Sequence, residues 1–161
     1  MAELRALAKD IGLHNPQTVL QSGNLVFQCP SRGAPALEAL LEKETAKRLG
    51  LAVTTFVRSG AEWTKLVAAN PYPREAKADP GRLVAILLKN ALMPKDCAAL
   101  KAAIKGREYF HADGRTLYAY YPDGQGESKF TAPLIDRILD TTCTARNWNT
   151  VLKLATLVGA P

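Results

Sequence analysis

Residues 124–129, with the sequence GQGESK, carry the chemistry that is easiest to state. They connect a predicted strand to a predicted helix, and the free N–H groups and the dipole of a helix N-terminus attract anions. Gly126 lets the backbone approach a ligand, Ser128 can donate a hydrogen bond, and Lys129 adds a positive charge. The alternative is a flexible turn in which Ser128 caps the helix. The segment therefore predicts either an anion site or an ordinary helix start.

A second polar segment, ARNWNT at residues 145–150, carries groups suited to the same chemistry. Arg146 can hold a phosphate or carboxylate through two parallel hydrogen bonds. The neighbouring side chains that can also form hydrogen bonds are Asn147, Asn149 and Thr150. One hypothesis is that two helix N-termini, each with a cation and polar groups, converge on one anion.

The alternative for residues 143–155 is structural. Apolar residues recur at helical spacing along this stretch, which predicts an amphipathic helix. In this interpretation Asn147 caps the helix, Trp148 packs in the core and Arg146 pairs with an acidic neighbour. Asparagine on an exposed helix face is costly enough to need an explanation, so both interpretations stay open.

The motif QSGN is a third candidate site. Strand-like residues flank it on both sides, and the Gly-Asn step predicts a tight hairpin turn. The alternative is that its polar side chains reach a ligand or the other half of the chain. These side chains are Gln21, Ser22 and Asn24.

The sequence shows no motif for catalysis or metal binding. Its two histidines, His14 and His111, lie in unrelated contexts, and no acidic cluster has metal-ligand spacing. The possible nucleophiles Ser22 and Cys97 have no partner visible in the sequence. We therefore predict no metal and no cofactor and leave catalysis undecided. The alternative to a binding protein is a transferase or hydrolase that acts on a phosphorylated small molecule.

The composition is that of a globular protein with excess positive charge. Of 161 residues, 47% are hydrophobic and 22% are charged, and the formal net charge is +6. This charge suits an anionic small molecule or weakly bound nucleic acid, without defining specificity. Tyr118, Tyr120 and Tyr121 on a predicted strand lie beside Arg107 and Arg115, as in RNA-binding sheets. Aromatic residues are also common in ordinary strands.

Nothing in the sequence points to a membrane or to secretion. The longest apolar run, residues 83–88, is too short to cross a bilayer, and no signal-peptide pattern precedes the fold. The three cysteines fit neither a disulfide framework nor a metal site. We therefore expect a cytoplasmic protein with reduced thiols.

The predicted order of elements gives the fold class. Residues 1–70 read as helix, hairpin, helix, strand and helix, and residues 83–161 as strand, helix, hairpin and two helices. Residues 71–82 hold three prolines and predict a linker. Both halves follow the split βαβ plan, which predicts an α+β protein of two ferredoxin-like lobes with the ligand between them. The first lobe lacks its opening strand. We expect this strand upstream of Met1, and the alternative is that another strand fills its place.

Three long segments resemble one bacterial family, domain of unknown function 1697. They are residues 1–27, 114–130 and 144–157, and the pair QSGN and ARNWNT is specific. The resemblance extends over essentially the whole chain and implies ferredoxin-like lobes with no established activity. Members typically begin with a strand and an arginine- and glycine-bearing segment. This chain lacks that segment, in agreement with the missing opening strand.

Overall fold

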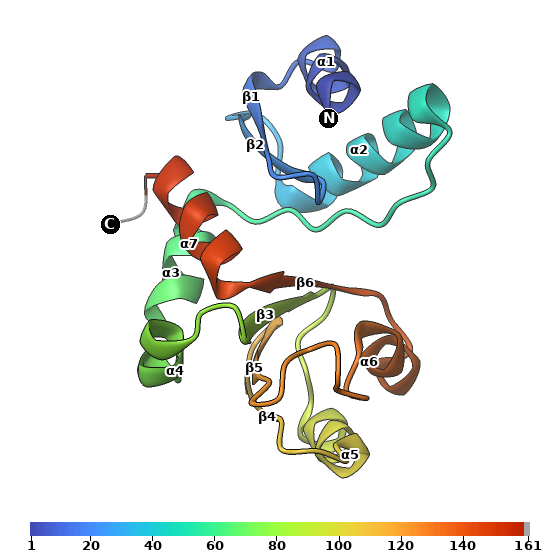
Figure 1. Ribbon diagram of the computed structural model, residues 1–161. Helices are drawn as coiled ribbons and strands as arrows, with labels where there is room; N and C mark the ends of the chain where they lie inside the picture. The colour runs from blue at the N-terminus through green and yellow to red at the C-terminus, as the bar shows by residue number, and fades with distance from the viewer. Residues whose placement is uncertain (160–161) are drawn as a thin grey trace. The chain divides into compact units, whose positions relative to one another are not determined.

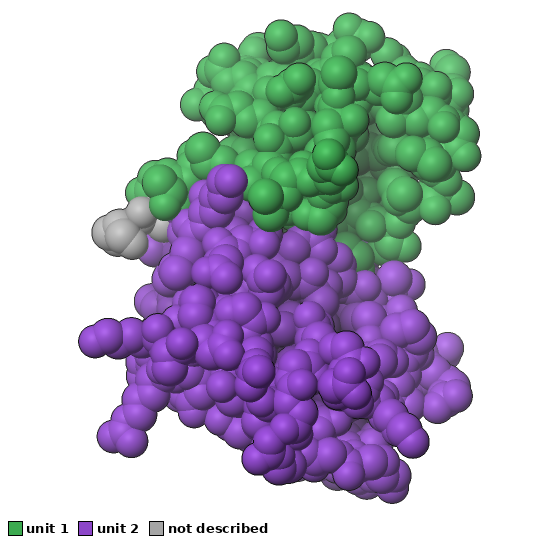
Figure 2. Space-filling view, viewed as in Figure 1, with its two compact units in different colours: residues 1–63, 156–161 green, residues 64–155 purple. Residues whose placement is uncertain are grey.

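The computed structural model describes residues 1–159, which form two compact units (Figure 1, Figure 2). Unit 1 comprises residues 1–63 and the last described residues from Thr156, and unit 2 comprises Thr64–Ala155. Each unit combines helices with an antiparallel sheet, so the predicted α+β class is confirmed. Two helices contain the unit boundaries: α3 spans Gly60–Ala68 and α7 spans Trp148–Leu157.

Unit 1 is a β-hairpin packed against two helices. Strands β1 and β2 pair antiparallel in a two-stranded sheet. Buried leucines of the helices meet those of the hairpin, and α2 ends at Gly50, whose φ of 65° is left-handed. The bounds are Ala2–Asp10 for α1, His14–Val19 for β1, Asn24–Gln28 for β2 and Ala34–Leu49 for α2.

The turn between β1 and β2 confirms the hairpin predicted from QSGN. Gly23 has a φ of 74°, a conformation that glycine adopts without strain. Asn24 is buried, and its Nδ2 donates to the carbonyl of Val19 at 3.1 Å and to Ser22 Oγ at 2.8 Å. The asparagine therefore fixes the turn from inside.

Residues 51–57 differ from the prediction, because the structure assigns them to no strand. The backbone N–H groups of Thr55 and Val57 instead donate to the carboxylates of Glu42 and Glu38, at 2.7 and 2.8 Å. Val57 also packs against the core of unit 1. The β-branched residues of this run favour a strand, but a strand also needs a neighbouring backbone to pair with. Here side-chain carboxylates of α2 accept the backbone hydrogen bonds instead.

Unit 2 is built on a four-stranded antiparallel sheet in the order β4-β5-β3-β6. All six residues of the central strand β3 are buried, as its apolar run predicts. The hairpin of β4 and β5 turns at Gly114, also as predicted. The bounds are Leu83–Leu88 for β3, Tyr109–Asp113 for β4, Thr116–Tyr120 for β5 and Cys143–Asn147 for β6.

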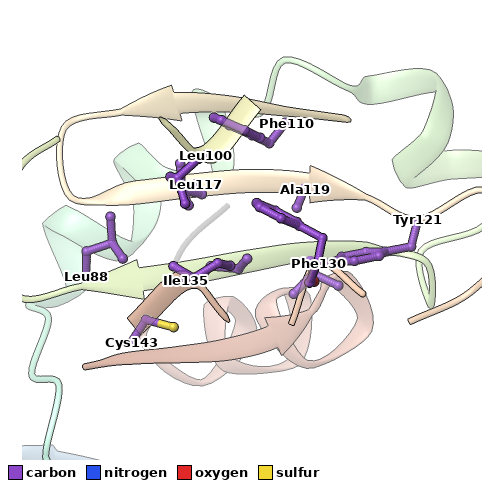
Figure 3. Packing of buried hydrophobic residues seen from close by; sticks show 11 residues of the cluster. Leu88, Leu100, Phe110, Leu117, Ala119, Tyr121, Phe130, Ile135 and Cys143 are labelled. Atoms are coloured by element: carbon purple, nitrogen blue, oxygen red, sulfur yellow. The ribbon is translucent and has the colours of Figure 1, made fainter. Parts of the chain in front are cut away.

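Helices cover both faces of this sheet. Helices α5 (Pro94–Ala103) and α6 (Ala132–Leu139) pack on one face, where Leu100 and Ile135 contact the core cluster (Figure 3). On the other face the ring of Tyr118 lies 6.3 Å from that of Trp148 in α7. The resulting order β3-α5-β4-β5-α6-β6 follows the split βαβ plan and matches the predicted order of elements except for β6, whose residues the sequence predicts to be helical.

The segment predicted as a linker contains a helix, α4 (Pro73–Ala78), and belongs to unit 2. Two contacts tie this region to the sheet. The Tyr118 hydroxyl donates to the carbonyl of Leu66 at 2.7 Å, and the Tyr109 hydroxyl donates to Glu75 at 2.9 Å. Prolines thus begin and end short elements here instead of marking an unstructured connection.

Residues 143–147 are a strand, so the helix predicted over residues 143–155 begins five residues late. β6 pairs antiparallel with β3, with Ala145 opposite Ile86. Cys143 and Ala145 pack in the core cluster on the α5 and α6 face. The backbone groups on the second edge of β3 need hydrogen-bonding partners. Pairing with β3 therefore decides the conformation of residues 143–147, although their local pattern favours a helix.

Candidate functional site

A pocket of about 480 Å³ lies in unit 2, beside the loop that joins β5 to α6. One wall comes from the segment between α5 and β4, with Lys105 and Glu108. The other comes from residues 121–129, which include Ser128 and Lys129. The glycine-rich segment predicted as an anion site therefore does line a concave surface.

Two hydrogen-bonded turns shape the loop. Gly124 has a φ of 90°, and its N–H donates to the carbonyl of Tyr121 at 2.9 Å. The N–H of Ser128 donates to the carbonyl of Gln125 at 3.3 Å. The N–H of Gly126, which lies between these turns, donates to no backbone carbonyl of the described residues. The loop thus presents a backbone donor at its tip.

Ser128 ties the two walls together. Its hydroxyl donates to Glu108 Oε1 at 2.5 Å and accepts the N–H of Phe130 at 2.9 Å. The N-cap of α6 is Thr131, so the expected helix cap at Ser128 is wrong. Because the hydroxyl proton is donated to Glu108, Ser128 supports the pocket and is not a free donor for a ligand.

The charges around the pocket fall into two classes. Arg107 and Asp123 form an exposed ion pair, which raises the pKa of Arg107 and lowers that of Asp123 through their hydrogen bonds. The carboxylate of Glu108 accepts Ser128. By contrast, no described residue forms an ion pair or hydrogen bond with the ammonium group of Lys105 or Lys129. The pocket lining therefore combines two lysines that have no ion-pair partner among the described residues with the carboxylates of Glu108, Asp123 and Glu127.

Tyr121 lines the pocket as a structural residue. Its hydroxyl donates to the carbonyl of Phe130 at 3.0 Å, and burial raises its pKa. Tyr118 is also buried, and burial raises its pKa to about 12. Both side chains are neutral core residues near neutral pH and neither is a base.

The polar residues of ARNWNT have mainly structural contacts. Arg146 is half-buried on β6, where it donates to Thr144 Oγ1 and to the carbonyl of Ala145, both at 2.8 Å, and burial lowers its pKa. Asn147 Oδ1 accepts the N–H and the hydroxyl of Thr150, each at 3.0 Å. Asn147 is thus the N-cap of α7, as one of the two interpretations predicts.

The two remaining members of that segment fit the same picture. Trp148 is buried against Tyr118, so its predicted core role is confirmed. Asn149 is exposed on α7.

Lys129 lines the pocket of unit 2 and Arg146 does not, so their convergence on one anion stays a prediction. Arg146 lies opposite Ala85 on the edge strand β6, whereas Lys129 lies in the loop between β5 and α6. Because Ala145 faces α5 and α6, Arg146 faces the opposite side. Helices α6 and α7 therefore begin on opposite faces.

The three candidates from QSGN lie in unit 1. Gln21 and Ser22 are exposed at the turn, and Asn24 is buried within it. The hydrogen bonds of Asn24 account for its presence, since they satisfy the turn carbonyl.

Sequence reasoning missed two residues that the structure brings forward. Lys105 lines the same pocket as Lys129, and the sequence feature that could have indicated it is a lysine directly before a glycine after a helix. Tyr109 is exposed beside Tyr72 and Tyr120. The sequence feature that could have indicated Tyr109 is its position next to the buried Phe110 on a strand, because successive strand residues point to opposite faces.

Comparison with known proteins places the chain in a family. Residues 1–118 match the family model described as "Protein of unknown function (DUF1697)". The chain belongs to this family. The match confirms the resemblance seen in the sequence, and the pocket loop at residues 121–129 lies beyond the matched range.

A solved structure has the same fold as this DUF1697 protein. It is described as "The structure of conserved bacterial protein SP0830 from Streptococcus pneumoniae". The TM-score is 0.73 at 17% identity, over 98% of this chain and 88% of that one. At this identity the likeness shows the fold alone. No curated protein matches the chain.

Two further findings on the DUF1697 protein concern metal ions and membranes. Within residues 1–159 no group of three or more His, Cys, Asp or Glu side chains is placed to hold a metal ion. Over the same described residues, none of the helices is sufficiently long and apolar to pass through a membrane.

Proposed function

We propose that unit 2 binds a phosphate-bearing anion in the pocket between residues 105–108 and 121–129. The observation that carries the proposal is the pair of ammonium groups, from Lys105 and Lys129, on two walls of one pocket without ion-pair partners among the described residues. Two cations facing one concavity favour an anion whose charge is spread over several oxygens.

The backbone adds donors to these charges. The N–H of Gly126 has no backbone acceptor within residues 1–159, and a side chain built at this position would meet no described atom within 4 Å. A phosphate oxygen can approach such an open backbone closely. The loop therefore supplies hydrogen bonds where the lysines supply charge.

The pocket also carries three carboxylates, of which Asp123 has an ion-pair partner among the described residues. Glu108 accepts Ser128, and Asp123 pairs with Arg107, which leaves Glu127 as the exposed acid of the loop. Unit 2 as a whole holds 14 Lys and Arg against nine Asp and Glu. The long-range field around the pocket thus also favours an anion.

This proposal replaces the larger ligand set expected from the sequence. It keeps Gly126 and Lys129, adds Lys105, and gives Ser128 a supporting role. The contacts described above for the other predicted residues favour no ligand role. Ser128 and Glu108 are the one hydroxyl–carboxylate pair in the described pocket lining, and because the Ser128 hydroxyl also accepts the N–H of Phe130, its contacts favour support of the loop over a transferase or hydrolase role. The three cysteines are unpaired thiols, which supports a cytoplasmic location.

Isothermal titration calorimetry with pyrophosphate tests the proposal. We expect Lys105→Ala and Lys129→Ala each to weaken binding by about 1.5–3 kcal/mol, the usual worth of a charged hydrogen bond. The matched control is Lys101→Ala, which removes the same charge from the exposed side of α5 outside the pocket. Equal affinity of all three variants would refute the proposal, because the lysines would then act only through net charge.

A further inference from the structure

An aromatic cluster lies on the sheet face of unit 2 opposite α5 and α6. Its central member, Tyr109, is 38% exposed on the edge strand β4. The Tyr109 ring centroid lies 5.2 Å from that of Tyr72, at an interplanar angle of 75°. It lies 5.6 Å from that of Tyr120, at 41°. The cluster therefore holds one tyrosine ring partly in solvent.

Contacts of its hydroxyl and of its ring fix the orientation of the Tyr109 side chain. Its hydroxyl donates to Glu75 Oε1 of α4 at 2.9 Å, and its ring contacts two others. Tyr118 and Tyr121, by contrast, are buried with their hydroxyls bound to carbonyls. An exposed ring fixed in orientation is a good stacking surface, since little rotamer entropy remains to be lost.

The cluster adjoins the proposed anion pocket along the chain. Tyr109 directly follows Glu108, and Tyr120 directly precedes Tyr121, and both Glu108 and Tyr121 line the pocket. Successive strand residues point to opposite faces, so the pocket and the ring flank the same end of β4 and β5. A ligand that crosses the β4 edge reaches both.

A second exposed ring continues the row. His111 lies two residues beyond Tyr109 on the same face of β4 and is exposed. Two residues along a strand span about 7 Å. The edge therefore presents two planar side chains in line, which suits a chain of several rings better than one ring.

We propose that this edge binds single-stranded nucleic acid, with bases stacked on Tyr109 and His111 and a backbone phosphate in the pocket of Lys105 and Lys129. The inference rests on the proposed function, because it names the source of the phosphate. Stacking on exposed rings requires unpaired bases, which a duplex does not offer. The surplus of basic residues in unit 2 favours a polyanion, and Glu75 is bound to the Tyr109 hydroxyl and leaves part of the ring exposed.

Fluorescence anisotropy of the full chain with a labelled ten-nucleotide oligouridine tests this. Tyr109→Ala should raise the dissociation constant at least fivefold, whereas Tyr109→Phe, which keeps the ring and loses the bond to Glu75, should change it less than twofold. His111→Ala should also weaken binding, a duplex of the same length should bind less tightly, and added salt should weaken all binding. Thermal melting of each variant verifies that it is folded.

Three results would overturn the inference: equal effects of Tyr109→Ala and Tyr109→Phe in folded protein, equal affinity for duplex and single strand, or no oligonucleotide binding. Pyrophosphate titration of the same samples separates the two proposals. Lysine-dependent pyrophosphate binding without oligonucleotide binding refutes only the nucleic-acid inference. Oligonucleotide binding that needs Tyr109 but neither Lys105 nor Lys129 refutes the placement of a backbone phosphate in the pocket, and pyrophosphate binding that is also independent of both lysines refutes the anion pocket itself.

Discussion

The two units follow a similar order of elements but complete their sheets differently. In unit 2, β3 pairs on both edges with backbone, from β5 and β6. In unit 1, residues 51–57 occupy the corresponding place after the second helix, yet Glu38 and Glu42 accept two of their N–H groups in place of a strand. The difference shows that strand-like residues become a strand only where another backbone lies alongside.

The units also differ in charge. Unit 1 contains seven Lys and Arg against six Asp and Glu, whereas unit 2 contains 14 against nine. The net charge of the protein is therefore concentrated in the unit with the complete sheet and the pocket. This distribution supports the proposal of an anion site in unit 2 more directly than the overall charge of +6 does.

Truncation in the core of unit 2 should have the largest effect. The Phe130 ring is buried, stacks on Phe110 at 5.7 Å, and directly follows the pocket loop. Phe130→Ala should lower the free energy of unfolding by about 3–5 kcal/mol, measured by urea denaturation. A decrease of less than about 1 kcal/mol in the free energy of unfolding would show that packing around Phe130 contributes little to the stability of unit 2.

Alkaline pH should destabilise unit 2 through a buried tyrosine. Burial raises the Tyr118 pKa from 10.0 to about 12, so above pH 10 the unfolded chain loses this proton while the folded chain keeps it. The stabilisation is complete below pH 10, and about 1.4 kcal/mol is lost per pH unit up to pH 12. Urea denaturation of wild type and Tyr118→Phe should therefore give a stability difference that shrinks above pH 10. A difference independent of pH would contradict this.

The carboxylates of α2 should protect the backbone amides of residues 51–57 in unit 1 from hydrogen exchange. Removing the acceptor in Glu42→Ala should cost about 1–2 kcal/mol locally and speed amide exchange at Thr55 about tenfold. Glu44→Ala, which removes a carboxylate of α2 that pairs with Arg48, is the control. Hydrogen exchange read by NMR distinguishes them, and unchanged exchange at Thr55 would remove the contrast between the units.

The smallest expected effect on stability concerns Asn147, the N-cap of α7, and Asn149 within α7. Asn147 caps the helix, so Asn147→Ala should cost about 1 kcal/mol of stability. Asn149 is exposed, and Asn149→Ala should stay within about 0.5 kcal/mol. Thermal denaturation of both variants tests this. A reversed order would show that Asn149 has the more important contact.

Local features were predictable from the sequence. Ser59 and Glu62 have the spacing of a capping box, and both of its hydrogen bonds are present, at 2.8 and 3.2 Å. The turn at QSGN and the buried strand β3 were likewise predictable, because neighbouring residues determine them.

Non-local features were not predictable from the sequence. Strand β6 has a helix-like pattern and pairs only because β3 needs a second neighbour. Lys105 and Lys129 are 24 positions apart in the sequence, so only the folded hairpin shows that they share a pocket. Arg146 was misplaced for the same reason, since its face follows from the strand and not from a helix.

Titration of the isotope-labelled chain with pyrophosphate, followed by amide NMR, tests the central claim most directly. We predict saturable shifts at Gly126 and its loop neighbours, which disappear in the double variant Lys105→Ala and Lys129→Ala. Saturable shifts confined to residues 145–150 or to unit 1, or no shifts at all, would contradict the assignment of anion binding to this pocket.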